Sequence, residues 1–140
     1  MGAACLTDEV AEVIHPGDHA STFGANPAIC AAGLVVLQQI LAPGFLENVA
    51  EVGDFLRSEI GRAKAQIPCI KEVRGLGQLT GVELTIKAQD IVNEGYKQGL
   101  ILGSAGDFVL RLAPPLIMKR EQAKTVLERL IPILEEAGPR

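Results

Sequence analysis

A helix without a polar face is the feature that most restricts what this chain can fold into. Asn26 and Pro27 predict its start, because asparagine caps helices and proline suits the first helical position. From residue 28 to residue 37 almost every side chain is apolar. A helix that is apolar all round is buried on all sides, which a chain of 140 residues rarely achieves alone. We therefore expect more protein around this helix.

The rest of the chain alternates between helix and strand patterns. Apolar residues recur every three or four positions in the other predicted helices, and glycines interrupt short apolar stretches in the predicted strands. We expect helices at about 7–14, 27–42, 45–65, 88–98 and 119–137, β-type segments between 70 and 86, and strands at 100–102 and 108–112. Pro132 is expected to kink the last helix or end its regular part. The order predicts an α+β fold, with a small sheet covered by helices on one face.

Charge and cysteine content exclude several classes of protein. The net charge is −4, with 13 basic and 17 acidic residues, so neither nucleic acid nor an anionic membrane is an expected partner. The first ten residues lack the basic start of a signal peptide, and the longest apolar run, residues 27–37, is too short to span a bilayer. Three cysteines without a CxxC pattern favour reduced thiols in a cytoplasmic protein.

The loop before the apolar helix is the first candidate site. Ser21 and Thr22 precede a helix N-terminus, where free N–H groups and the helix dipole attract anions such as phosphate. The same residues are also typical of a turn followed by a capped helix, and that alternative stays open.

Arg111 is the second candidate. Strand alternation puts Phe108, Leu110 and Leu112 on one face and Arg111 with Val109 on the other. A buried arginine in so apolar a strand needs a carboxylate or phosphate partner. An exposed strand face that carries one charge is the alternative.

Other arrangements give little support for chemistry. His15 and His19 flank a Pro-Gly turn and lack the helical spacing of a metal pair, so no metal site is expected. Asp18, His19 and Ser21 are too close in sequence for a catalytic triad. Gly75 and Gly77 indicate a bulge or tight turn rather than a dinucleotide site, because no third glycine or following helix accompanies them. Cys30 is interpreted as a small core residue.

Four motifs in order nevertheless resemble one family over nearly the full length. They are MGAACLTDEVA at 1–11, GDHASTFGANP at 17–27, VRGLG with GVEL at 73–77 and 81–84, and VLRLAPPL at 109–116. The chain resembles the C-terminal part of class III, pyridoxal-phosphate-dependent aminotransferases. The GDHASTF stretch favours the acetylornithine and succinyldiaminopimelate branch, and acetylornithine aminotransferases are the most similar.

The resemblance implies a fold and two binding roles. Residues 44–140 would form the C-terminal small α+β domain of a fold-type I aminotransferase, and residues 1–43 a remnant of the large cofactor-binding domain with helices at the domain and dimer interfaces. Thr22, helped by Ser21, would bind the phosphate of pyridoxal 5'-phosphate in the neighbouring subunit of a homodimer. Arg111 would bind a carboxylate of the amino-acid or 2-oxo-acid substrate, since bidentate pairing suits that contact.

Two departures from the family stand out. Ala25 replaces the usual glycine, which would tighten the loop. The family's Schiff-base lysine lies in a segment that would end just before Met1, so this chain has no catalytic residue of its own. The six lysines present are interpreted as solvated charges, because a nucleophilic lysine needs a desolvated pocket; they are Lys64, Lys71, Lys87, Lys97, Lys119 and Lys124.

Three hypotheses follow from the sequence. The first is a C-terminal portion of an acetylornithine-type aminotransferase, inactive alone, whose parent moves an amino group from N-acetylornithine to 2-oxoglutarate in arginine or lysine biosynthesis. The second is a non-catalytic binding module that forms oligomers through residues 27–42. The third is one half of a split aminotransferase whose lysine lies on a companion chain.

Overall fold

The chain forms two units, Met1–Ala42 and Pro43–Arg140, which are described separately as unit 1 and unit 2. The computed structural model describes residues 2–19 and 21–138; Met1 and Ala20, which belong to two of the sequence motifs, lie outside the described residues. The boundary between the units falls at the Pro43-Gly44 pair, where Gly44 has a positive φ of 82°. That unit 1 is the remnant of a larger domain stays a prediction.

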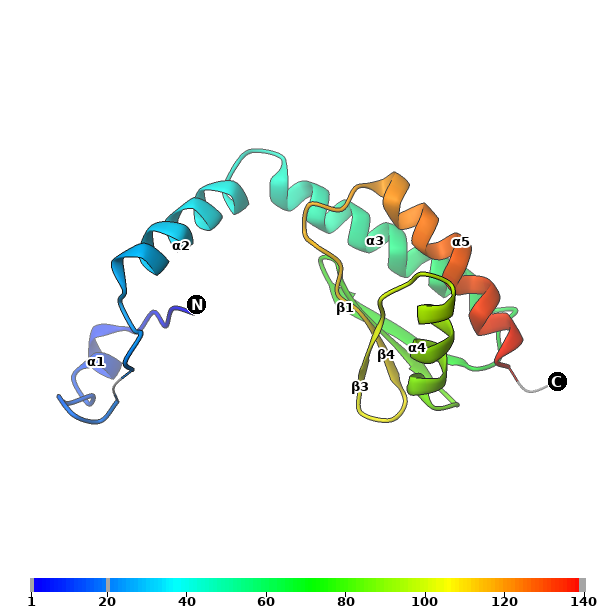
Figure 1. The fold of residues 1–140 in the computed structure, drawn as a ribbon, viewed down its shortest axis with the longest axis horizontal. Coiled ribbons are helices and arrows are strands. Elements are labelled where there is room, and N and C mark those ends of the chain that lie inside the picture. The colour runs from blue at the N-terminus through cyan, green and yellow to red at the C-terminus, as the bar shows by residue number, and fades with distance from the viewer. Residues whose placement is uncertain (1, 20, 139–140) are drawn as a thin grey trace. The chain divides into compact units, whose positions relative to one another are not determined.

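Unit 1 contains two helices, α1 (Asp8–Ala11) and α2 (Pro27–Ile40) (Figure 1). α1 ends earlier than expected, and Thr7 at its N-cap makes no side-chain capping hydrogen bond. α2 begins as predicted: the Asn26 side chain accepts hydrogen bonds from the Ala28 and Ile29 amides at 3.0 and 3.4 Å. This cap explains why the helix starts at Pro27.

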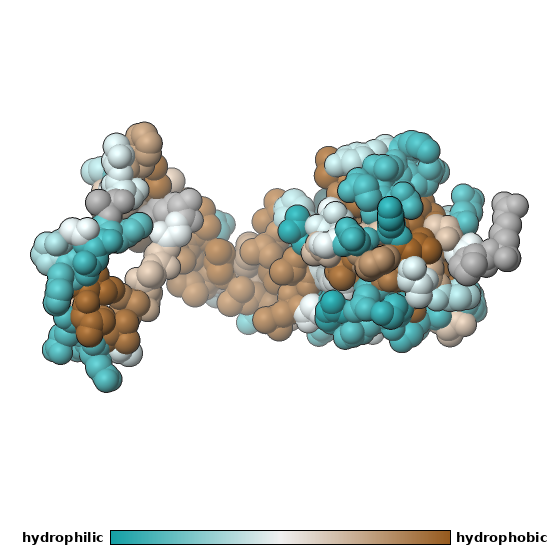
Figure 2. Space-filling model, turned by 90° about the horizontal axis from the view of Figure 1, so that it is seen from below, coloured by the Kyte–Doolittle hydropathy of each residue, from teal (hydrophilic) through white to brown (hydrophobic). Residues whose placement is uncertain are grey.

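No described residue of unit 1 is buried. The apolar helix, around which we expected more protein, is therefore exposed within its own unit, and Figure 2 shows hydrophobic residues along it. Cys30, expected in a core, is only half-buried, because unit 1 has no core of its own. The side chains that would cover α2 do not come from this unit.

Unit 2 carries an antiparallel sheet of four strands in the order β1-β2-β4-β3. The strands are β1 (Ile70–Leu76), β2 (Leu79–Leu84), β3 (Gly103–Ala105) and β4 (Val109–Leu112). The helices are α3 (Phe45–Ala63), α4 (Ala88–Lys97) and α5 (Arg120–Glu136). Figure 1 shows α3 and α5 running side by side, and both contact each other directly. The predicted α+β fold with a small sheet is confirmed.

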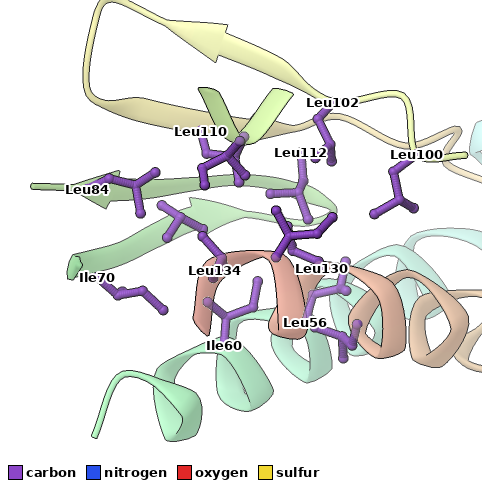
Figure 3. Packing of buried hydrophobic residues seen from close by; sticks show 14 of the residues in the cluster. Leu56, Ile60, Ile70, Leu84, Leu100, Leu102, Leu110, Leu112, Leu130 and Leu134 are labelled. Carbon is purple, nitrogen blue, oxygen red and sulfur yellow. The ribbon is translucent and has the colours of Figure 1, made fainter. Parts of the chain in front are cut away.

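The hydrophobic core lies between one face of the sheet and the helices. Along β2 and β4 every second residue is buried, so only one face of each strand packs inward. Figure 3 shows Leu110 and Leu112 of β4 on the same side as Leu130 and Leu134 of α5. The opposite face of the sheet carries the more exposed residues, and Arg111 is one of them.

One expectation about this unit is wrong, and for another, the effect of Pro132, the structure excludes one of the two alternatives. The strand predicted at 100–102 lies instead at Gly103–Ala105, because Leu100 and Leu102 are buried in the core while residues 103–105 pair with β4. α5 continues through Pro132 to Glu136 instead of ending there. Buried side chains on both sides of the proline hold this helix in place, and they offset the cost of about 3 kcal/mol that an internal proline carries; they are Leu130, Ile133 and Leu134.

Candidate functional site

Arg111 lies on the face of the sheet that the helices leave open. It sits in β4, between β2 and β3, and its cross-strand partners are Gly81 on one side and Gly103 on the other. Arg111 is exposed, and its guanidinium has no hydrogen bond or ion pair with any residue that the structure describes. The alternation predicted from the sequence is therefore correct, and the guanidinium stays open to a ligand.

Gly103 allows this arrangement. A Cβ atom added at Gly103 would lie 3.3 Å from Arg111 Nη2 and 3.4 Å from Nε. The guanidinium thus lies against the β3 backbone at Gly103, where no side chain displaces it. At Gly81 a Cβ would instead contact Val109 Cγ1, at 3.4 Å. Both glycines widen the open face around Arg111, but only Gly103 borders its guanidinium.

One carboxylate on the open face, that of Glu83, already has partners. Glu83, on β2, accepts hydrogen bonds from Lys71 Nζ at 2.7 Å and from Arg74 Nη1 at 2.9 Å. The hydrogen bond from Lys71, followed by the one from Arg74, lowers the pKa of Glu83 below its ordinary value. Glu83 therefore stays ionised but is bound to these two cations, and it does not neutralise Arg111.

The loop of the first candidate site folds through local hydrogen bonds. The His15 amide donates to Asp18 Oδ2 at 2.7 Å, and the Gly24 amide donates to the Ser21 carbonyl at 3.2 Å. Ala25 has a φ of +55°, the left-handed region where a β-carbon costs about 1–2 kcal/mol. The family that the chain resembles usually has a glycine here, and a glycine would adopt this φ without strain.

Ser21 and Thr22 are exposed, and neither hydroxyl has a partner among the described residues. The helix N-terminus behind them differs from the expectation. We expected free N–H groups there, but Asn26 Oδ1 takes the amides of Ala28 and Ile29. An anion at this loop would therefore depend on the two hydroxyls, because the side-chain cap competes for the helix amides.

The two candidate sites belong to different units, each described by itself. Ser21 and Thr22 lie in one loop of unit 1, and Arg111 lies on the sheet of unit 2. All six lysines are exposed, so none has the desolvated pocket that a nucleophilic amine needs. Within residues 2–19 and 21–138, no three potential ligands come together to hold a metal ion.

Local patterns in the sequence did not indicate the role of two residues in unit 2. One is Gly103, which falls between the strands predicted at 100–102 and 108–112. The other is Gln78, which is 1% exposed and whose Nε2 donates to the carbonyls of Leu116 and Met118. It ties the turn between β1 and β2 to the segment that follows β4. In the sequence, only the position of this polar residue between two apolar strands indicated that Gln78 has a structural role.

No single helix in the described part of the chain is long and apolar enough to cross a membrane, and only the successive helices α2 and α3, taken together, reach that length and hydropathy. α3 contributes four buried residues to unit 2, namely Val52, Gly53, Leu56 and Ile60. Its apolar side is thus already packed against protein.

Comparison with known proteins gives a consistent result. The class III aminotransferase family matches residues 1–134. The acetylornithine aminotransferase of Caldanaerobacter subterraneus subsp. tengcongensis is 39% identical over 134 residues, which are 95% of this chain and 34% of that protein. The chain therefore spans about a third of the length of this curated relative.

Solved structures agree with the sequence relatives. The acetylornithine aminotransferase of Elizabethkingia anophelis superposes with a TM-score of 0.81 at 29% identity, over 91% of this chain and 34% of that one. An ornithine aminotransferase of Toxoplasma gondii, described with partial occupancy of pyridoxal phosphate at its active site, gives a TM-score of 0.82 at 30% identity, over 91% of this chain and 31% of that one. The fold described above thus corresponds to about a third of the length of each of these two enzymes.

Proposed function

Because the chain belongs to the class III aminotransferase family, we propose that it is the C-terminal portion of an acetylornithine-type aminotransferase. The parent reaction would transfer an amino group from N-acetylornithine to 2-oxoglutarate, in cytoplasmic arginine or lysine biosynthesis. The chain would contribute binding groups to this reaction and no catalytic base. The observation that carries the proposal is the free guanidinium of Arg111 on the open face of the sheet.

Arg111 would bind a carboxylate of the substrate. A guanidinium offers two parallel N–H donors to a carboxylate, and such charged pairs are roughly twice as strong as neutral hydrogen bonds. The group has no competing partner in the described structure, and Gly103 leaves room beside it. Every substrate of the proposed reaction, amino acid or 2-oxo acid, carries a carboxylate, so one residue would serve both half-reactions.

Thr22, with Ser21, would hold the phosphate of the cofactor that the family implies. The donor chemistry fits, because both hydroxyls are exposed and free to donate to a phosphate oxygen. The Asn26 cap leaves the task to these hydroxyls rather than to the α2 amides. In a homodimer this loop would serve the neighbouring subunit. Pyridoxal 5'-phosphate, when bound, supplies the electron-withdrawing ring that amino transfer requires.

The lysine of the parent enzyme would come from the part of the relatives that this chain does not match. The chain covers 34% of the Caldanaerobacter enzyme, and its own six lysines are all exposed. The exposed α2 helix favours a protein that works in association with other protein, as one half of a split enzyme or in an oligomer. Alone, the chain would not transaminate.

The test combines this chain with the missing part of a relative. The full chain would be co-expressed with a Caldanaerobacter enzyme from which the third that corresponds to this chain has been removed. Amino transfer from N-acetylornithine to 2-oxoglutarate would then be assayed with added cofactor. We expect activity only from the mixture. Loss of one bidentate charged contact, about 1.5–3 kcal/mol, predicts that Arg111→Gln raises KM by about tenfold to a hundredfold.

The control variant in this assay is Arg129→Gln. Arg129 is an exposed arginine on α5 whose Nη1 donates to the carbonyls of Gln98 and Gly99. The Arg129→Gln substitution removes one positive charge from unit 2, as Arg111→Gln does, but leaves the open face of the sheet unchanged. Activity of the chain alone, or an active mixture in which both variants behave alike, would contradict the proposal.

A further inference from the structure

Two buried side chains of unit 2 carry oxygen atoms without a hydrogen bond to any residue that the structure describes. Within residues 2–19 and 21–138, only Gln78 and Thr80 are both polar and buried, at 1% and 0% exposure. Gln78 Oε1 and Thr80 Oγ1 are the two unpaired atoms. Buried polar groups in native proteins are nearly always paired, either with protein or with ordered water. Both oxygens therefore call for a partner.

The orientation of the Gln78 amide is fixed by its surroundings. Its Nε2 donates to the carbonyls of Leu116 and Met118, at 3.4 and 3.2 Å. A flipped amide would bring its own oxygen against two carbonyl oxygens, which are acceptors as well, so the nitrogen belongs on this side. Gln78 Oε1 thus faces away from the two carbonyls and lacks a donor.

Thr80 enters the core at the same end of the sheet. It lies two residues after Gln78, near the start of β2, and it pairs with Leu112 of β4, which is also buried. β4 then leads into the segment that contains Met118, whose carbonyl accepts from Gln78. The turn between β1 and β2 and the segment after β4 therefore bring both unpaired oxygens to one corner of the core.

Unit 2 has space beside this corner. A cleft of about 370 Å³ is lined in part by Leu112 and Met118. Leu112 is the cross-strand partner of Thr80, and the Met118 carbonyl is a hydrogen-bond partner of Gln78. One water molecule occupies about 30 Å³ in the liquid, so the cleft is large enough to admit water next to the two oxygens.

We infer that one internal water molecule bridges Gln78 Oε1 and Thr80 Oγ1. One O–H of the water donates to Gln78 Oε1, and the Thr80 hydroxyl donates to the water or accepts its second O–H. A water molecule suits these atoms because it is small, uncharged and both donor and acceptor. The bridge joins the turn between β1 and β2 to β2 itself, on the inward face of the sheet. It does not depend on the proposed function.

Thr80→Val tests the inference through the sign of its effect on stability. Valine has the shape of threonine without the hydroxyl, so the bridging water would lose one of its partners. The folding equilibrium constant of the full chain, measured by urea unfolding, should fall at least about fivefold. Without a bridge, valine would instead remove an unpaired buried hydroxyl and its desolvation cost, and stability would rise. An unchanged or higher stability of Thr80→Val would therefore overturn the inference.

Thr85→Val is the matched control. Thr85 is exposed and follows the same strand, so its substitution should change the folding equilibrium constant by no more than about twofold. Equal losses in the two variants would contradict a specific role for the Thr80 hydroxyl. Thr80→Ser is the second variant, since it retains the hydroxyl and should retain the water.

A crystal structure of the full chain that resolves ordered waters separates a water bridge from a direct contact. We expect one water within about 2.5–3.0 Å of both oxygens, in wild type and in Thr80→Ser. A direct hydrogen bond between the Thr80 hydroxyl and Gln78 Oε1 would overturn the inference, and so would two oxygens without a shared water. This measurement decides the question even if Thr80→Val does not fold.

Discussion

The guanidinium of Arg111 lies against Gly103, at a distance where an added Cβ atom would be 3.3 Å from Nη2. The two residues are cross-strand partners in β4 and β3. The position of the guanidinium on the open face thus depends on the absence of a side chain one strand away. Gly103 would not bind the substrate itself, but it controls how Arg111 presents its N–H donors.

The first prediction concerns this pair. Gly103→Ala should move the Arg111 guanidinium by a few tenths of an ångström and raise the KM for N-acetylornithine several-fold in the reconstituted enzyme, with a smaller change in kcat, since a misplacement of about 1 Å can cost a hundredfold. Gly81→Ala is the control, because its Cβ would contact Val109 and not Arg111. Equal KM values for the two variants would argue against a positioning role for Gly103.

A second prediction concerns the stability of unit 2. A Cβ at Gly53 of α3 would lie 1.7 Å from the Gly77 carbonyl oxygen in the turn between β1 and β2. Gly53→Ala should therefore lower the free energy of unfolding by about 3 kcal/mol, the upper part of the usual range for overpacking. Urea unfolding of the full chain, followed by circular dichroism, measures this.

Gly61→Ala in the same helix is the control. No atom lies within 4 Å of its added Cβ, so the better helix propensity of alanine should stabilise the chain by up to about 1 kcal/mol. The two glycine-to-alanine changes should thus have opposite signs. The same sign for both would show that α3 does not pack against the turn as described.

The third prediction is a pH dependence that arises from Glu83. Its pKa is lowered in the folded chain by Lys71 and Arg74, so it stabilises the fold at neutral pH. This contribution is lost as the pH falls below about 4.3, the ordinary value for glutamate. The thermal midpoint of Glu83→Gln should therefore drop less between pH 7 and pH 3.5 than that of wild type.

The control for this measurement is Glu135→Gln. Glu135 is exposed on α5, and no ion pair involves it among the residues described. It should retain the wild-type pH dependence. If Glu83→Gln and Glu135→Gln respond alike, the contacts between Glu83 and its two cations do not stabilise the sheet.

The fourth prediction separates the cysteines. Cys69 is buried and its Sγ donates to the Leu134 carbonyl at 3.4 Å. Burial raises the pKa of this thiol, and only the thiolate reacts readily. A thiol reagent at pH 8 should therefore label the exposed Cys5 rapidly and Cys69 only after unfolding, as followed by peptide mapping. Labelling of both at one rate would contradict the burial of Cys69.

The fifth prediction concerns the lysines. The chain should show no stoichiometric absorbance change with pyridoxal phosphate, and borohydride reduction should leave all six lysines unmodified in a peptide map. The physical reason is their exposure, because a nucleophilic lysine needs a desolvated pocket. A stoichiometric adduct at one of them would indicate an active site within this chain.

Local patterns in the sequence predicted most elements of the fold. The cap at Asn26, the period of α3 and the glycine after α4 act through neighbouring residues, so the helices appear within a few residues of their expected bounds. Strand alternation alone predicted that Arg111 lies on the face opposite Leu110 and Leu112, and the structure decided that this face is exposed. β3 was misplaced because its three residues are held by pairing with β4, and pairing with a distant strand leaves no local pattern.

By itself the sequence determined the family, the α+β fold and an apolar helix that needs more protein than its own unit provides, because motifs and periodicity are properties of consecutive residues. Only the tertiary structure decided that Gly103 borders the Arg111 guanidinium and that Glu83 is held by two cations. Strand register and side-chain contacts set these relationships, since they join residues that the sequence holds apart.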